Sequence, residues 1–216
     1  MRVAILFSVF TFFIYLGCDN SQKAVENKND ISAVRQLEGE QLVHRGQYLT
    51  TVAGCNDCHS PKKFNAHGFT FDSGRLLSGH PADSPLPPIE VNATQPGGWM
   101  LMGPDLTSFV GPWGISYAAN LTPDSAAGIG AWTEDNFIQA LRKGKHLGMD
   151  NGRPVLPPMP WEIIGKMTDE DLKSIYAYLR TLPPIANKVP APLPPNEVVV
   201  VKPNPFKSKK EAVASK

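Results

Sequence analysis

Three residues in one short stretch have the side chains best suited to chemistry in this chain. Cys55 and Cys58 stand three positions apart, and His59 directly follows the second cysteine. Side chains at this spacing lie on the same side of a helical turn. Their sulfurs can form thioether bonds to the two vinyl groups of one haem, and the histidine can then bind the iron as its proximal ligand. The motif therefore predicts one covalently attached haem c.

The two cysteines have other uses that the spacing alone leaves open. A bare Cys-x-x-Cys also occurs as a disulfide or as a thioredoxin-like redox pair, but that use does not explain the histidine that follows. A zinc site needs a second pair of ligands. The only other cysteine, Cys18, lies in the apolar N-terminal region. Haem attachment is the use that accounts for the whole motif.

A single histidine leaves the sixth position on the iron open, and Met159 is the residue that we expect to fill it. Met159 lies in the stretch Leu-Pro-Pro-Met-Pro-Trp. Prolines restrict their own backbone and that of the preceding residue, so this loop can hold a sulfur at low entropic cost. A thioether ligand raises the reduction potential, as suits an electron carrier. The alternatives are a core role for Met159 or a histidine ligand, for which spacing does not exclude His67, His80 and His146.

The N-terminus predicts export. Arg2 precedes an apolar run over residues 3–16, which is short for a bilayer span, and Cys18 follows. This resembles a bacterial lipoprotein signal, in which the cysteine becomes the lipid-modified first residue. We therefore expect a protein of the periplasm or cell envelope, anchored to the membrane through Cys18. An ordinary signal peptide or an uncleaved anchor is the alternative, and both also export the chain. Lipidation of Cys18 and haem attachment together use all three cysteines.

Composition divides the 216 residues into four segments. We predict a signal over residues 1–17, a flexible polar tether over 18–37, one domain over 38–195, and an extended, partly disordered tail over 196–216. The formal net charge of +1 gives no indication of a nucleic-acid-binding surface.

Hydrophobic periodicity predicts three helices within that domain. The first runs from about residue 38 to Gly54, with Gly46 placed where another helix could cross closely. The others start at Thr133 and Thr168, each a hydroxyl cap followed by acidic residues. Residues 60–123, rich in proline, glycine and aromatic groups, are expected to form a long ordered insertion over the haem edges, with short β-bridges near 69–71 and 115–117. The predicted fold class is mainly α.

The attachment motif, the Pro-Pro-Met-Pro-Trp stretch and the helix predicted over 168–182 together resemble a class I cytochrome c domain. Further stretches, such as Asn-Leu-Thr-Pro at 120–123 and Gly-Ile-Gly-Ala-Trp-Thr at 128–133, resemble the cytochrome subunits of membrane-associated bacterial dehydrogenases. The resemblance implies a helical bundle around one haem. It also implies thioether bonds at Cys55 and Cys58, His59 as the proximal ligand and Met159 as the distal ligand. A helix crossing that involves Gly46, Tyr48 and Tyr176 is implied as well.

These patterns favour an electron-transfer protein rather than an enzyme. The expected function is to carry single electrons between a dehydrogenase or other donor and a respiratory acceptor, such as a terminal oxidase or another cytochrome. A haem enzyme or an oxidoreductase-complex subunit whose sixth iron site is open to a small molecule is the first alternative. A membrane-anchored thiol-redox or interaction module without haem is the second.

Overall fold

The computed structural model describes residues 37–89 and 93–200. Cys18, the predicted signal, nearly all of the predicted tether and the lysine-rich end of the tail lie outside these residues, so those predictions remain untested. Within the described part of the chain, no helix has the length and apolar character needed to cross a membrane.

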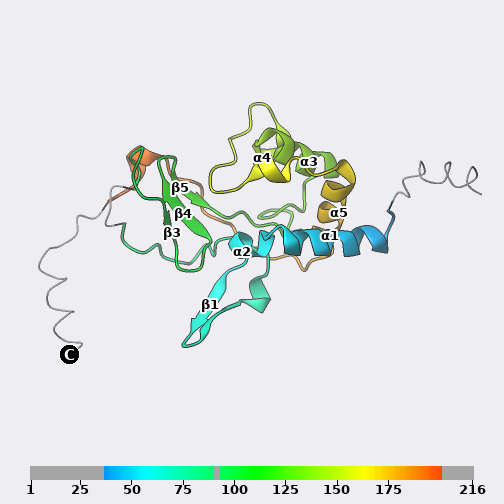
Figure 1. The fold of residues 1–216 in the computed structure, drawn as a ribbon, viewed down its shortest axis with the longest axis horizontal. Coiled ribbons are helices and arrows are strands. Elements are labelled where there is room, and N and C mark those ends of the chain that lie inside the picture. The colour runs from blue at the N-terminus through cyan, green and yellow to red at the C-terminus, as the bar shows by residue number, and fades with distance from the viewer. Residues whose placement is uncertain (1–36, 90–92, 201–216) are drawn as a thin grey trace, which may run out of the picture. The chain divides into compact units, whose positions relative to one another are not determined.

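Two helices far apart in the sequence, α1 (Glu40–Val52) and α5 (Asp169–Leu179), pack against each other (Figure 1). Gly46 makes this contact possible. A Cβ added at Gly46 would lie 1.8 Å from the backbone oxygen of Ser174 and 2.8 Å from the Cβ of Tyr178. The close crossing predicted at Gly46 is confirmed.

The partner predicted for that crossing is wrong in detail. Tyr178, not Tyr176, lies against Gly46, and the hydroxyl of Tyr176 instead donates to the backbone oxygen of Trp132 at 2.6 Å. Tyr48 is 59% exposed and lies beside Arg45. Helical periodicity gives the buried face of a helix but not the residue that meets a given neighbour across it.

Polar caps set the ends of the two later helices, as the sequence predicts. In α3 (Glu134–Lys143), the Thr133 hydroxyl accepts from the backbone N–H of Asn136, and Gly144 ends the helix in a left-handed conformation with φ +61°. In α5, the Thr168 hydroxyl accepts from the N–H of Asp171. This helix ends at Leu179, ahead of the prolines at 183 and 184 that were expected to stop it.

One hydrophobic core joins these helices. It is built mainly from the buried faces of α3 and α5, with Leu49 from α1 and residues of the connecting loops. The short helix α4 (Trp161–Ile164) adds Ile164. The buried members are Leu49, Leu77, Ile129, Phe137, Ile138, Ile164, Leu172, Ile175 and Leu179.

The segment between the first and later helices contains two small antiparallel sheets. Strands β1 (Lys62–Asn65) and β2 (Gly68–Phe71) form a hairpin in which Asn65 Oδ1 accepts from the N–H of His67. Strands β3 (Leu101–Met102), β4 (Ser108–Gly111) and β5 (Gly114–Tyr117) form the second sheet in that order. The β-bridges expected near 69–71 and 115–117 therefore belong to complete strands.

The cytochrome-like helices thus share the chain with more β-structure than a mainly α class implies, and the described residues have a mixed fold. Irregular segments and 3-10 turns join these elements, namely η2 (Ser73–Arg75), η3 (His146–Gly148) and η4 (Pro195–Glu197). After α5 the chain is extended, and Leu193 pairs with Ile115 of β5 while Val200 pairs with Ile89. The proline-rich segment is held by backbone contacts with the second sheet.

The aromatic groups of residues 60–123 are less buried than their number suggested. Phe109 is only 5% exposed, but Phe64 is 57%, Phe69 50% and Trp99 80% exposed. Several aromatic side chains of this ordered segment therefore remain largely exposed. The three phenylalanines of the hairpin instead contact one another, with ring centroids about 6 Å apart in two pairs.

Candidate functional site

A short helix of five residues, α2 (Cys55–His59), carries the whole Cys-x-x-Cys-His motif. Gly54 precedes it with φ +69°, a left-handed conformation that favours glycine, and separates α2 from the end of α1. The backbone N–H of Ser60 bonds to the oxygen of Asn56 and closes the helix. Cys55 and Cys58 therefore stand one helical turn apart, as haem attachment requires.

His59 is held in place from two sides. Its ring is buried, with the residue 8% exposed, and its Nδ1 lies 2.7 Å from the backbone oxygen of Ala119. Its own backbone oxygen accepts from Gly79 at 2.8 Å. Because a carbonyl can only accept, Nδ1 carries the proton and Nε2 keeps a lone pair for a metal. Burial lowers the pKa of His59, which also favours the neutral, ligating form.

The cysteines do not have the properties of a redox pair. No disulfide joins them. Burial raises the pKa of Cys55 to about 11 and also raises that of Cys58, mainly by the same cause. A thiol-redox centre needs the opposite shift, because the thiolate is the reactive form. The described residues also contain no group of three or more His, Cys, Asp or Glu side chains that could hold a metal ion alone.

Met159 lies on a loop that is tied down at several points. Its N–H bonds to the oxygen of Leu156 at 3.3 Å, and its own oxygen accepts from Trp161 at 2.9 Å. The hydroxyl of Ser116 in β5 donates to Pro157 at 2.6 Å. The half-buried Met159 and Cys55 both pack against the same helical core. The structure therefore brings the loop and the attachment helix to one cluster.

The four other histidines differ in how free they are to bind a metal. His44 is exposed on α1 beside Glu40, and His67 is exposed in the hairpin turn. His80 is buried, and its Nδ1 bonds to the hydroxyl of Thr107 at 2.7 Å. His146 stacks on Trp132 at 5.3 Å between ring centroids.

Arg75, Trp99 and Trp113 have side-chain N–H groups of the kind that could donate to haem propionates, and their surroundings differ. Arg75 lies 3.5 Å from Asp83. Trp99 is the most exposed large apolar residue of the described chain. The indole N–H of Trp113 donates to Ser116 at 3.1 Å.

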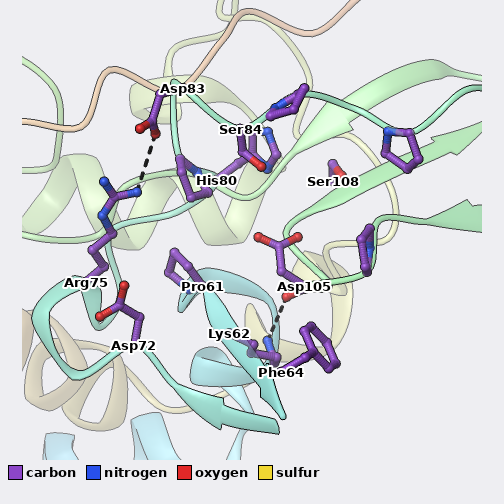
Figure 2. A pocket seen from close by; sticks show the side chains of 14 residues that line it. Pro61, Lys62, Phe64, Asp72, Arg75, His80, Asp83, Ser84, Asp105 and Ser108 are labelled. Carbon is purple, nitrogen blue, oxygen red and sulfur yellow. Dashed lines mark hydrogen bonds and ion pairs between the residues drawn. The ribbon is translucent and has the colours of Figure 1, made fainter. Parts of the chain in front are cut away.

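An open pocket of about 410 Å³ lies beside the attachment helix (Figure 2). Its wall combines prolines with Phe64 and with charged or polar groups that include Lys62, Arg75, His80 and Asp105. None of Cys55, Cys58, His59 and Met159 lines it. The pocket is thus separate from the attachment motif.

Two contacts of the site were not predicted from the sequence. The carbonyl of Ala119 that orients His59 has no sequence signal, since any residue provides a carbonyl. Lys62, by contrast, donates to backbone oxygens of Asp57 and Ser60 at the end of α2. Pro61 has no N–H to continue the helix, so the sequence indicated that a carbonyl at the end of α2 would need another donor.

Comparisons with known proteins agree with this site. The Cytochrome c family model matches residues 43–183, which is more than half of the chain and includes the whole motif and Met159. The fructose dehydrogenase cytochrome subunit of Gluconobacter japonicus is 30% identical over 64% of this chain and 21% of its own length. The alcohol dehydrogenase (quinone) cytochrome c subunit of Gluconobacter oxydans is 28% identical over 74% of this chain and 26% of its own.

The gluconate 2-dehydrogenase cytochrome c subunit of Pantoea cypripedii is similar at 31% identity, over 64% of this chain and 23% of its own length. The chain therefore spans about a quarter or less of each of these relatives. The placement of Cys55 and Cys58 one helical turn apart and the unprotonated Nε2 of His59 fit the attachment of one haem. The chain belongs to the cytochrome c family and carries covalently bound haem c.

Proposed function

We propose that this chain is a periplasmic, membrane-tethered cytochrome that carries single electrons between a dehydrogenase or other donor and a respiratory acceptor. Haem supplies the redox chemistry when bound, and the residues of the chain hold it and set its potential. Cys55 and Cys58 form the thioether bonds, His59 is the proximal ligand and Met159 the distal ligand. Lipidated Cys18 is the proposed membrane anchor.

The observation that carries the proposal is the position of Met159. Its side chain packs on the helical core that Cys55 also contacts, and hydrogen bonds at Leu156, Pro157 and Trp161 hold its loop. A loop held in this way can keep a weak thioether ligand on iron, because little backbone entropy remains to be lost. A six-coordinate iron favours electron transfer over binding of a small molecule.

A role as a subunit of an oxidoreductase complex has support of its own. The three relatives described above are named as cytochrome subunits of dehydrogenases, and this chain matches only a part of each. We therefore propose a dehydrogenase as the electron donor, met either in a stable complex or in transient encounters.

The experiment is a comparison of two methionine variants. Met159→Ala should keep covalent haem but have a lower reduction potential and lack the weak red-end band of oxidised haem that reports sulfur ligation. Met167→Ala is the matched control, because Met167 is also partly buried against the helical core. It should keep both the band and the potential. An unchanged band and potential in Met159→Ala would refute the assignment and reopen the sixth site to a histidine or a small molecule.

A further inference from the structure

Lys62 has a buried ammonium group next to the haem-attachment helix. The residue is only 7% exposed, although lysine almost always keeps its charge in water. Its Nζ donates to three backbone oxygens, those of Asp57, of Ser60 at 3.1 Å and of Asp105 at 3.0 Å. A charged ammonium has three N–H donors, so the oxygens use all of them. Figure 2 shows the bond to Asp105 at the edge of the pocket.

The first of these contacts repairs the end of α2. In a continuing helix the oxygen of Asp57 would accept from the N–H of residue 61. That residue is a proline and has no N–H. The Lys62 side chain supplies the missing donor and adds a positive charge at a helix C-terminus, where the helix dipole favours it.

Aromatic rings of the hairpin also lie near the ammonium. Its Nζ lies 5.4 Å from the ring centre of Phe71 and 5.9 Å from that of Phe69. Both distances are within the range of cation–π attraction. The antiparallel register pairs Lys62 with Phe71, so strand pairing keeps ring and charge together. The hairpin thus contributes to the shielding of this charge from water.

Hydrogen bonds and the short backbone segments between them connect Lys62 with the imidazole of His59. Lys62 holds the backbone oxygen of Asp105, and the Asp105 carboxylate accepts from the hydroxyl of Thr107 at 2.8 Å. The oxygen of Thr107 accepts from Ala118 at 2.9 Å, and that of Ala119 accepts from Nδ1 of His59. Because Lys62 also binds α2, this path closes into a ring through the attachment helix.

We propose that Lys62 is a positioning residue that fixes the attachment helix and, by its buried positive charge, raises the reduction potential of the attached haem. Oxidised haem carries one more positive charge than reduced haem, so a nearby cation disfavours the oxidised state. Salt screens a buried charge much less than an exposed one. The proposal rests on haem attachment at α2 and is independent of the electron donor and acceptor.

Redox titration of Lys62→Met, followed by visible absorbance, tests this proposal. Lys63→Met is the matched control, since it removes the same charge from the next residue of the strand. The Lys63 ammonium is exposed and pairs with Asp72 at 2.9 Å. We expect a lower potential in Lys62→Met, a far smaller shift in Lys63→Met, and an unchanged red-end band in both. The unchanged band separates this effect from loss of the Met159 ligand.

Two further variants separate charge from packing. Lys62→Arg keeps the charge and should keep a potential near that of the wild type. Lys62→Gln removes the charge but keeps two N–H donors, so it should repeat the downward shift even if Lys62→Met accumulates no haem. Failure of both uncharged variants to load haem, with normal loading of Lys62→Arg, would also support the positioning role.

Equal potentials in Lys62→Met and Lys63→Met would overturn the proposal. So would a Lys62→Gln protein that loads haem and keeps the wild-type potential. Loss of folded protein in all three Lys62 variants would overturn it as well, because Lys62 would then be a general requirement for folding.

Discussion

The helix crossing at Gly46 yields the most quantitative prediction about the fold. In Gly46→Ala, the new Cβ would lie 1.8 Å from the oxygen and 2.5 Å from the carbon of the Ser174 carbonyl. An ordinary contact is about 3.5 Å, so α1 and α5 must separate by roughly 1.5 Å to accept it. The obstacle is backbone, and no rotation of a side chain can remove it.

Two effects of this substitution oppose each other. Alanine is a better helix former than glycine by about 1 kcal/mol. Overpacking of a close contact costs about 1–3 kcal/mol or more, and here the separation also loosens Leu49 and Leu172 in the shared core. We place the cost at the upper end, so the net loss in the free energy of unfolding is about 2 kcal/mol. For a chain of this size, that loss lowers Tm by about 4–8 °C.

The assay is thermal unfolding of haem-loaded protein, followed by circular dichroism. Gly74→Ala is the matched control, because Gly74 has an ordinary φ and the nearest atom to an added Cβ is 3.6 Å away, on Asp72. Its Tm should stay close to that of the wild type. A Gly46→Ala protein at least as stable as the wild type would refute the close crossing, since the steric cost would then be no larger than the gain in helix propensity.

Three further predictions concern the tail, a buried histidine and the anchor. Asn187→Ala should lower the free energy of unfolding by roughly 1–3 kcal/mol and speed proteolysis of the tail, because the Asn187 amide donates to the oxygens of Ser78 and His80 at 2.7 and 2.8 Å. Burial lowers the pKa of His80 from its ordinary 6.5, so the unfolded chain binds a proton more readily than the folded chain. The free energy of unfolding therefore decreases as the pH falls below about 6.5. The difference in denaturant stability between pH 7.5 and 5.5 should therefore shrink in His80→Gln, and an equal difference in both proteins would contradict this. Cys18→Ala should move the protein from the membrane fraction to the soluble fraction with its haem intact, and its recovery in membranes would indicate another anchor.

Local chemistry made several features predictable from the sequence. Thr133 and Thr168 cap their helices because a hydroxyl before acidic residues satisfies free N–H groups, and this rule needs no tertiary information. Gly46 was recognisable as a crossing point because a missing side chain on a helix face has few other uses. The Cys-x-x-Cys-His motif led to the family because its three residues serve one chemical purpose.

Features that depend on distant contacts were not predictable in this way. The choice of Tyr178 over Tyr176 at the crossing depends on the rotation of α5 about its own axis. The carbonyl of Ala119 meets His59 across 60 residues of chain, and the oxygen of Asp105 meets Lys62 across 43. Composition also could not show that residues 60–123 hold two sheets, because turns and strand pairing there depend on tertiary packing.

The central claim is that one haem is attached at α2 and ligated by His59 and Met159. The most direct test is a visible spectrum of the purified wild-type protein, oxidised and reduced, together with the haem-to-protein ratio after denaturation. We predict one covalent haem per chain, a c-type reduced spectrum and the weak red-end band of sulfur ligation in the oxidised state. A c-type spectrum without that band would contradict ligation by Met159. Protein without haem, from cells able to attach it, would contradict the claim as a whole.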